Sequence, residues 1–285
     1  WRGVGGEMNA LRLGSTAIIS TATTSGHREA IRLIAGRTSD GKAHRRAFSS
    51  VALSRREISI EKYHDKYHSC PPVMLLHGLF GSKLNFNSFA KAIHAPRCIV
   101  ADLRNHGSSP HHDDMSIEAM VADTLHLMDE IGIEEWVLVG HSLGGKVAMA
   151  TALMHPDRVR KMGCIDMAPV DYLSVESPKN RDGYSTRDVV ELVHSIHLAQ
   201  EGITNRKEAD ALLQKRAPWL SEGLRAFLLQ SAHERSDGTW GWKMNVGAIM
   251  RCYPQLAGWE YPASLTYHQP SLFIKGSESR FIENH

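Results

Sequence analysis

The chain has 285 residues, 42% of them hydrophobic and 22% charged, which is the composition of an ordinary globular protein with one large core. Its net charge is +2, but the positive excess lies in the first 50 residues and the remainder is mildly acidic, so the charge does not favour a nucleic-acid partner. No apolar run approaches the length of about 18 residues that a membrane-spanning helix needs. Cys98 and Cys164 lie in apolar runs and no Cys-x-x-Cys occurs, which favours buried thiols in a reducing compartment.

Residues 1–56 differ in composition from everything that follows. They are rich in Arg, Ser, Thr and Ala and poor in acidic residues, which is typical of a mitochondrial transit peptide. The stretch therefore predicts import, with the mitochondrial matrix as the destination. A disordered tail on a cytoplasmic protein is the alternative. Because the first residue is Trp1, the sequence leaves the start codon undefined.

Short apolar runs alternate with helical patterns from residue 57 to residue 170. The expected strands are 58–63, 73–76 and 98–101, and the expected helices are 85–94 and, after the N-cap Ser116, 117–131. The second and third strands are apolar throughout, as is usual for strands buried on both faces. This order predicts right-handed crossovers and an α/β fold with a doubly wound, mostly parallel sheet.

The most informative stretch is residues 136–145, Trp-Val-Leu-Val-Gly-His-Ser-Leu-Gly-Gly, in which an apolar run leads directly into Gly-x-Ser-x-Gly. A helical pattern follows at once and stops before Pro156. Strand, tight turn and helix are the context of a nucleophile elbow, in which Gly140 and Gly144 leave room for a strained serine. The pattern predicts that Ser142 is a catalytic nucleophile. A glycine-rich turn without chemistry is the alternative.

A second glycine-containing stretch, His77-Gly78-Leu79-Phe80-Gly81, directly follows the expected strand at residues 73–76. In a sheet of this type, backbone N–H groups at this place form an oxyanion hole together with the residue after the nucleophile. We therefore expect the amides of Leu79 and Leu143 to bind the oxyanion of an acyl-transfer reaction. A simple glycine turn is the alternative.

Candidate acids follow two later strands. An apolar run ends at Ile165 and delivers Asp166 to the carboxyl end of its strand, where sites form in open α/β sheets. Glu278 follows the expected strand at residues 271–274 and is the alternative acid. Asp166 as a cap for its own Ala168-Pro169 turn is a further possibility.

Residues 171–265 break the alternation of strands and helices. They have mainly helical patterns and hold four of the six tryptophans, which predicts a helical cap over the active site. Residues 266–285 are expected to begin the second part of the core.

Four stretches resemble the α/β-hydrolase superfamily, and more narrowly the mitochondrial α/β-hydrolase domain-containing protein 11 group and related small bacterial esterases. They are residues 75–87, 102–110, 142–149 and 165–170. The resemblance covers residues 70–285 and implies a serine esterase, lipase or thioesterase without metal or organic cofactor. It also implies that Asp166 is the acid of the triad. The resemblance further implies a histidine after the last core strand, in a Gly-His-Trp-like context. His285 is too close to residues 272–274 to be this residue, so we expect the chain to be truncated before a helix, a strand and the general base.

These features predict a hydrolase that transfers an acyl group to water, with a small-molecule ester or thioester, lipid-like or with a small acyl group, as its substrate. A catalytically idle hydrolase fold that acts as a binding or scaffold protein is the alternative. Among the other histidines, His141 is expected to pack beside the elbow rather than act as the base. A solvated loop is expected for His106, His111 and His112. His194 and His197 lie three residues apart on an expected helix but lack a third metal ligand nearby.

Overall fold

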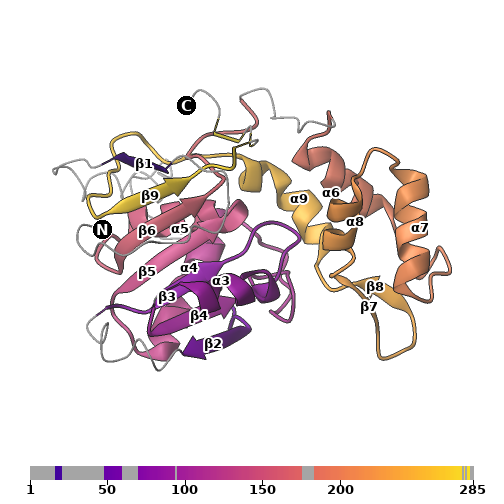
Figure 1. Cartoon of the computed structure of the whole chain (residues 1–285), viewed down its shortest axis with the longest axis horizontal. Helices are drawn as coiled ribbons and strands as arrows, with labels where there is room; N and C mark the ends of the chain where they lie inside the picture. Colours follow the sequence, from indigo (N-terminus) through magenta and orange to yellow (C-terminus); the bar gives the residue numbers. More distant parts are fainter. Residues whose placement is uncertain are drawn as a thin grey trace, which may run out of the picture.

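The computed structural model describes residues 17–20, 48–59, 70–93, 95–174, 183–277, 279 and 281–282. It has two parts, a core built on one large sheet and a smaller, mainly helical cap beside it (Figure 1). Helix α9 (Val246–Ala257) is the cap helix nearest the sheet.

The core sheet has seven strands in the order β1-β9-β6-β5-β3-β4-β2. Its inner strands are parallel to one another, whereas the edge strands β1 and β2 are antiparallel to their neighbours. The strands are β1 (Ala17–Ser20), β2 (Arg55–Ser59), β3 (Val73–Leu76), β4 (Arg97–Ala101), β5 (Trp136–His141), β6 (Val159–Ile165) and β9 (Ser271–Ile274). The sheet confirms the expected mostly parallel α/β architecture. From β3 the chain first continues to β4 on one side and then returns to β5 on the other side, so the order of the strands reverses between β3 and β5. Open α/β sheets form a ligand-binding crevice at such a point.

Helices cover both faces of the sheet, because successive residues of a strand point to opposite faces. Met74 and Leu76 of β3 belong to the larger core with α4 and α5, whereas Leu75 lies in a second cluster with Ala90 of α3. The core helices are η2 (Lys83–Phe86), α3 (Asn87–Ala92), α4 (Ile117–Ile131) and α5 (Leu143–Met154). As the sequence predicts, Ser116 caps α4, since its side chain accepts a hydrogen bond from the Ala119 amide.

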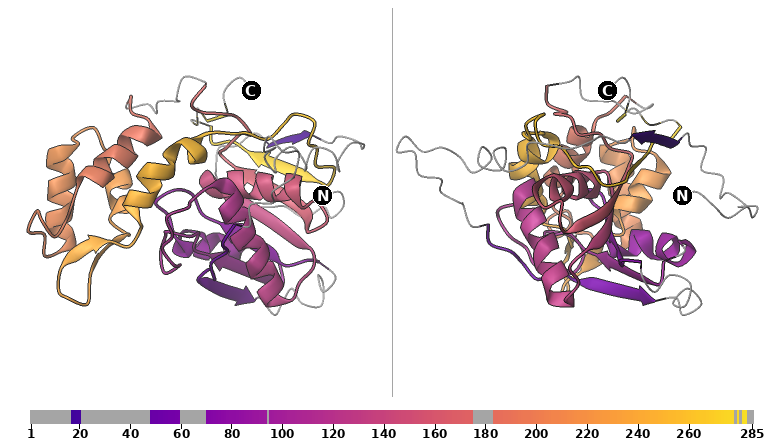
Figure 2. Two further views of the ribbon diagram at one scale, coloured as in Figure 1. Left: turned by 180° about the vertical axis from the view of Figure 1, so that it is seen from behind. Right: turned by 90° about the vertical axis from the view of Figure 1, so that its left-hand side faces the viewer.

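The cap contains a β-hairpin that the sequence analysis did not predict. Its elements are α6 (Thr186–Ser195), α7 (Arg206–Arg216), α8 (Glu222–Leu228), β7 (Ala232–Glu234), β8 (Trp240–Trp242) and α9. Seen from behind and from the side, α9 again lies against the core (Figure 2). The mainly helical patterns of residues 171–265 did not indicate this hairpin, in which the chain turns at Asp237 and Gly238. Gly238 has φ +81°. Asp-Gly between short apolar runs is a hairpin signal, and Trp240 and Trp242 alternate around Gly241.

The core begins before residue 57, where the sequence analysis placed its start. Leu53 is buried in the main core, and the Val51 amide donates a hydrogen bond to Asp123 Oδ1 at 2.6 Å. The backbone of β1, which pairs with β9, also lies within the expected transit peptide, residues 1–56. Most of that stretch lies outside the described residues, so import stays a prediction.

Cys98 and Cys164 are buried and free, as the sequence predicts. Burial raises the pKa of Cys98 to about 11 and the pKa of Cys164 to about 12, so both thiols are protonated at neutral pH. Among the described helices, none has both the length and the apolar character needed to cross a bilayer.

Candidate active site

Ser142 lies on the strand–turn–helix element that the sequence predicts. It directly follows β5 and precedes α5, and its backbone has φ 51° and ψ −119°, in a region that residues with a side chain rarely adopt. The turn is tight enough to exclude side chains at both flanking glycines. A Cβ atom at Gly144 would lie 2.2 Å from the Leu76 carbonyl oxygen, and one at Gly140 would lie 2.0 Å from the Gly144 oxygen. This close packing holds Ser142 in its left-handed conformation.

Asp166 lies beside Ser142 because their strands are neighbours in register. His141 of β5 pairs with Ile165 of β6, and the Ser142 amide donates to the Ile165 carbonyl at 3.0 Å. Adjacent strands are separated by about 4.8 Å. The two residues that follow this pair, Ser142 and Asp166, are therefore delivered to the same edge of the sheet. Asp166 also has a left-handed backbone, with φ 58°.

The hydrogen bonds of Asp166 run to the next strand end rather than into its own turn. Its amide donates to the Ile274 carbonyl at 2.7 Å, and its Oδ1 accepts from the Gly276 amide at 3.2 Å. The Ala168 amide, which a local cap would bind, donates instead to the Tyr172 hydroxyl at 3.1 Å. The structure therefore gives no support to a local cap at Ala168. The alternative acid, Glu278, lies outside the described residues.

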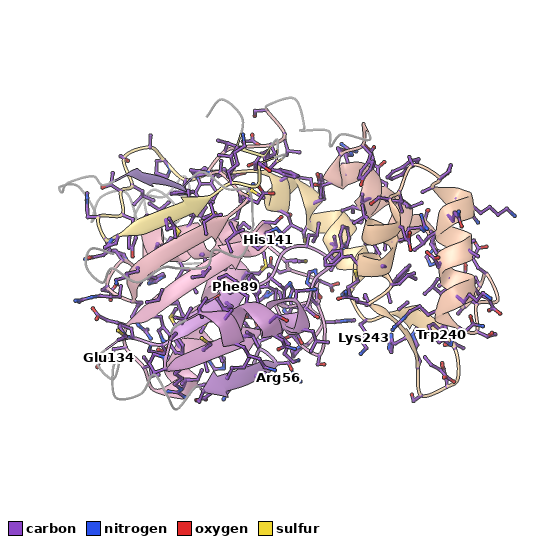
Figure 3. All side chains as sticks on the ribbon, in the orientation of Figure 1. Arg56, Phe89, Glu134, His141, Trp240 and Lys243 are labelled. Carbon is purple, nitrogen blue, oxygen red and sulfur yellow. The ribbon has the colours of Figure 1, made fainter. Side chains whose placement is uncertain are left out.

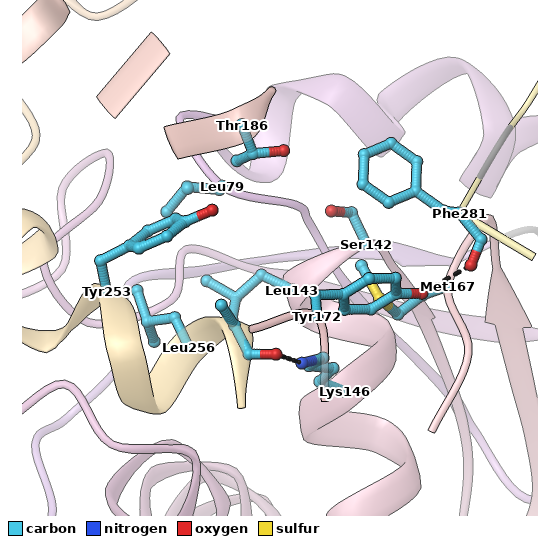
Figure 4. A pocket seen from close by; sticks show the side chains of 11 residues that line it. Leu79, Ser142, Leu143, Lys146, Met167, Tyr172, Thr186, Tyr253, Leu256 and Phe281 are labelled. Atoms are coloured by element: carbon cyan, nitrogen blue, oxygen red, sulfur yellow. Dashed lines mark hydrogen bonds between the residues drawn. The ribbon is translucent and has the colours of Figure 1, made fainter. Parts of the chain in front are cut away.

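A pocket opens at Ser142 between the sheet and the cap (Figure 4). Leu79 and Leu143, the two residues whose amides we expect to bind an oxyanion, line it together with Ser142. The further lining residues, which sequence reasoning missed, are Lys146, Met167, Tyr172, Thr186, Tyr253, Leu256, Ala257 and Phe281. Most of this wall is apolar, so it favours a hydrocarbon chain over a charged group. Only Lys146 carried a sequence signal, as a charged residue inside an otherwise apolar helical run.

His77 connects the loop that contains Leu79 to the loop after β4. Its Nε2 accepts a hydrogen bond from the Leu103 amide at 3.0 Å, so the proton of the neutral ring is on Nδ1, which donates to the Gly78 carbonyl at 2.8 Å. Burial lowers the pKa of His77 to about 4. Both ring nitrogens are occupied by backbone groups, so His77 holds the loop and is not available as a base.

His106 has a similar role, which corrects the expectation that it lies in a solvated loop. It is completely buried, and its Nε2 accepts a hydrogen bond from the Phe80 amide at 3.2 Å while Nδ1 donates to the Arg104 carbonyl at 3.0 Å. Phe80 has φ 65°, so this acceptor helps to hold a strained residue directly after Leu79. Burial lowers the pKa of His106 to about 3. No sequence signal indicates this contact, because the two loops are far apart in the chain.

Asp102 forms a second connection between the same two loops. Its carboxylate accepts hydrogen bonds from the backbone amides of Lys83 and Ser108, at 2.6 and 2.9 Å, and pairs with the Lys83 ammonium at 2.5 Å. These donors lower the pKa of the Asp102 carboxyl although burial opposes them. The loop with Leu79 is thus fixed from both ends.

Among the residues that the structure describes, the remaining histidines do not form a metal site. His141 lies on the side of the core that faces the cap (Figure 3), with its ring beside Gly78. His111 is exposed, and so are His194 and His197. Within the described ranges, no group of three or more His, Cys, Asp or Glu side chains is placed to hold a metal ion.

Comparisons with known proteins agree with this geometry. A family model described as the alpha/beta hydrolase fold matches residues 71–177. The chain is 35% identical to the sn-1-specific diacylglycerol lipase ABHD11 of Mus musculus, over 75% of this chain and 67% of that protein. It is 34% identical to the esterase YbfF of Escherichia coli, over 75% of this chain and 77% of that protein.

Solved structures lead to the same family. A marine microorganism esterase superposes with a TM-score of 0.69 at 31% identity, covering 79% of this chain and 80% of that chain. The chain spans about two thirds of the length of the vertebrate diacylglycerol lipases that it matches. This identity, together with the elbow and the sheet order, shows that the chain belongs to the α/β-hydrolase family and groups with its esterases and lipases.

Proposed function

We propose that this chain is a serine hydrolase that cleaves carboxylic ester or thioester bonds through an acyl-enzyme intermediate. The observation that carries the proposal is the left-handed backbone of Ser142 at an apolar pocket that Leu79 and Leu143 also line. A catalytically idle binding protein would not need to maintain such a conformation, which costs about 1–3 kcal/mol.

In the proposed reaction, Ser142 Oγ attacks the acyl carbonyl while a histidine removes its proton. The carbonyl electron pair moves onto oxygen, and the amides of Leu79 and Leu143 bind this oxyanion, at about 3–4 kcal/mol per donor in comparable enzymes. The protonated histidine then gives its proton to the leaving alcohol or thiol. Water, activated by the same histidine, attacks the acyl-serine and releases the acid.

Asp166 has the role of orienting this histidine. Its position at the end of a buried strand, one strand from Ser142, supports this assignment, because an orienting group on a rigid element fixes the ring more tightly. We do not assign the base to any described histidine. The rings of His77 and His106 are occupied by backbone hydrogen bonds, and that of His141 lies beside Gly78.

The pocket supports an aliphatic acyl group as the part of the substrate that is recognised. Leu79, Met167, Leu256 and Phe281 supply hydrocarbon surface around Ser142, and the relatives are named as a diacylglycerol lipase and esterases. We therefore propose a lipid-like or small acyl ester or thioester as the substrate.

The nucleophile is tested by covalent labelling of the full-length protein. A serine-directed fluorophosphonate should label it, and Ser142→Ala should abolish both labelling and hydrolysis of p-nitrophenyl butyrate. Ser195→Ala, at an exposed serine of α6, is the matched control and should label normally. Labelling that persists in the Ser142→Ala variant would contradict the assignment. A wild-type protein that neither labels nor hydrolyses esters would favour the idle binding protein.

The acid is tested by two matched substitutions. Asp166→Asn should lower kcat by about 10⁴, the loss known for the corresponding change in a serine protease. Glu278→Gln should leave most of the activity. If Glu278→Gln causes the large loss and Asp166→Asn does not, the acid follows β9 and our assignment is wrong.

A further inference from the structure

Lys146 is a buried lysine that the proposed chemistry does not use. It lies in α5 with only 1% of its surface exposed, although lysine is rarely buried completely. Its backbone amide donates to the Ser142 carbonyl at 3.1 Å, so it is one helical turn from the nucleophile. Its side chain lines the same pocket as Ser142. Burial of a charged group at this place needs a specific set of partners.

Those partners are carbonyl groups at the end of α9. Lys146 Nζ donates to the Ala257 oxygen at 2.5 Å and to the Gly258 oxygen at 2.8 Å, and it lies 4.9 Å from the centre of the Tyr172 ring (Figure 4). Ala257 is the last residue of α9 and Gly258 is its C-cap. Carbonyls at a helix C-terminus have no partner within the helix and carry partial negative charge. An ammonium group from α5 therefore caps α9.

The end of α9 is also a wall of the pocket. Tyr253, Leu256 and Ala257 all line the cavity that contains Ser142. Pro254 lies within this last turn and has no N–H to donate, so the turn has fewer hydrogen bonds of its own than a regular helix end. The capping contact from Lys146 is thus the polar link that connects this wall to the helix that begins at the nucleophile.

We propose that Lys146 is a positioning residue that sets the acyl-chain length accepted by the pocket, because it holds the end of α9 at a fixed distance from Ser142. This inference rests on the proposed ester hydrolase function. Without the ammonium group, the Gly258 carbonyl loses this donor and the Ala257 carbonyl keeps only the hydrogen bond from the Tyr172 amide, at 3.1 Å. The last turn of α9 is then held less firmly, and Leu256 and Tyr253 move away from Ser142. Longer acyl chains then fit, while short chains lose contacts with the wall.

The test compares Lys146→Met, which keeps the aliphatic stem, with Lys161→Met, which changes an exposed lysine of β6. Both are made in the full-length protein. Three quantities are measured. They are fluorophosphonate labelling of Ser142, kcat and KM for butyryl and octanoyl p-nitrophenyl esters, and amide hydrogen exchange over residues 255–258.

We expect Lys146→Met to keep fluorophosphonate labelling and to exchange faster over residues 255–258. Since one methylene in an apolar pocket changes kcat/KM by about tenfold or more, the ratio of octanoyl to butyryl activity should rise by about tenfold, mainly through KM. Lys161→Met should resemble the wild type in all three measurements. Lys146→Gln keeps a hydrogen-bond donor and should show a smaller rise in the ratio of octanoyl to butyryl activity. If Lys146→Met does not fold, this ratio in Lys146→Gln tests the inference in its place.

Two results would overturn the inference without affecting the proposed function. One is a labelled Lys146 variant whose ratio of octanoyl to butyryl activity equals that of the wild type. The other is an equal loss of activity towards both esters, which would indicate a general structural defect. Failure of the wild-type protein to label would instead contradict the proposed function itself.

Discussion

Acidification should destabilise this fold through two buried histidines next to the site. His77 and His106 are almost completely buried and accept backbone hydrogen bonds at Nε2, so protonation would break these bonds as well as bury a charge. Their rings also lie edge to face, with centres 5.2 Å apart, so two positive charges would repel each other. The folded protein therefore favours the neutral form of both rings.

The pKa shifts give the size of the effect. Burial lowers the pKa of His77 from 6.5 to about 4 and that of His106 to about 3, whereas both histidines titrate normally in the unfolded chain. Below pH 6.5 the unfolded chain binds protons that the folded chain cannot, so the contribution is fully present above this pH and is lost as the pH falls towards the folded values. At pH 5 the solution is about 1.5 pH units below the pKa of 6.5 that each histidine has in the unfolded chain. Protonation of the unfolded chain therefore costs the fold about 2 kcal/mol for each histidine. The total of about 4 kcal/mol is a large part of the roughly 5–15 kcal/mol that stabilises a typical domain.

Urea unfolding at pH 7 and pH 5 measures this loss. In His106→Gln, the side-chain amide oxygen can still accept the Phe80 hydrogen bond, and the group no longer titrates. The free energy of unfolding of this variant should fall by about 2 kcal/mol less than that of the wild type between the two pH values. His197→Gln, which replaces an exposed histidine outside the two loops, is the matched control. If the free energy of unfolding falls equally in the wild type and in His106→Gln between pH 7 and pH 5, the argument that buried His106 stays neutral is refuted.

Three further predictions concern packing, charge and targeting. Gly144→Ala should prevent the elbow from forming and abolish labelling, because its Cβ would lie 2.2 Å from a β3 carbonyl, whereas Gly223→Ala in α8 has open space and should retain labelling. Asp123→Asn should lower the free energy of unfolding by about 3–5 kcal/mol in urea titrations, since the neutral amide removes the negative charge that pairs with the buried Arg104 guanidinium. Residues 1–56 fused to a fluorescent reporter should direct it to mitochondria in cell imaging, and a cytosolic reporter would contradict the targeting prediction.

Local signals in the sequence were sufficient for the elements that carry the proposed chemistry. The apolar runs before Ser142 and Asp166 predict that both residues lie at strand ends. The neighbours of Ser142 that have no side chain are glycines in the sequence. The parallel order then delivers both residues to one edge of the sheet. The sequence could not show the hydrogen-bond partners of Asp166, because Ile274 and Gly276 are more than a hundred residues away in the chain.

Long-range contacts also explain the errors and omissions. Polar residues in a glycine-containing loop normally suggest exposure to solvent. His106 is buried instead, because another loop supplies the Phe80 amide, which donates a hydrogen bond to its ring. Lys146 could be noticed as a charge in an apolar helix, yet its partners, Ala257 and Gly258, belong to the cap. In both cases the side chain is fixed by backbone groups, which leave no pattern of residue types to find.

The order of the sheet explains why the pocket lies where it does. The chain passes from β3 outward to β4 and then returns to β5 on the other side of β3, so the connections after β3 and β5 leave towards opposite faces. Leu79 follows β3 and Ser142 follows β5, so a crevice separates them that the sheet itself cannot fill. The cap closes this crevice with the end of α9, whose last two carbonyls accept hydrogen bonds from Lys146. The sheet therefore fixes the positions of Ser142 and Asp166, while Lys146 on the elbow helix connects the same region to the pocket wall at the end of α9.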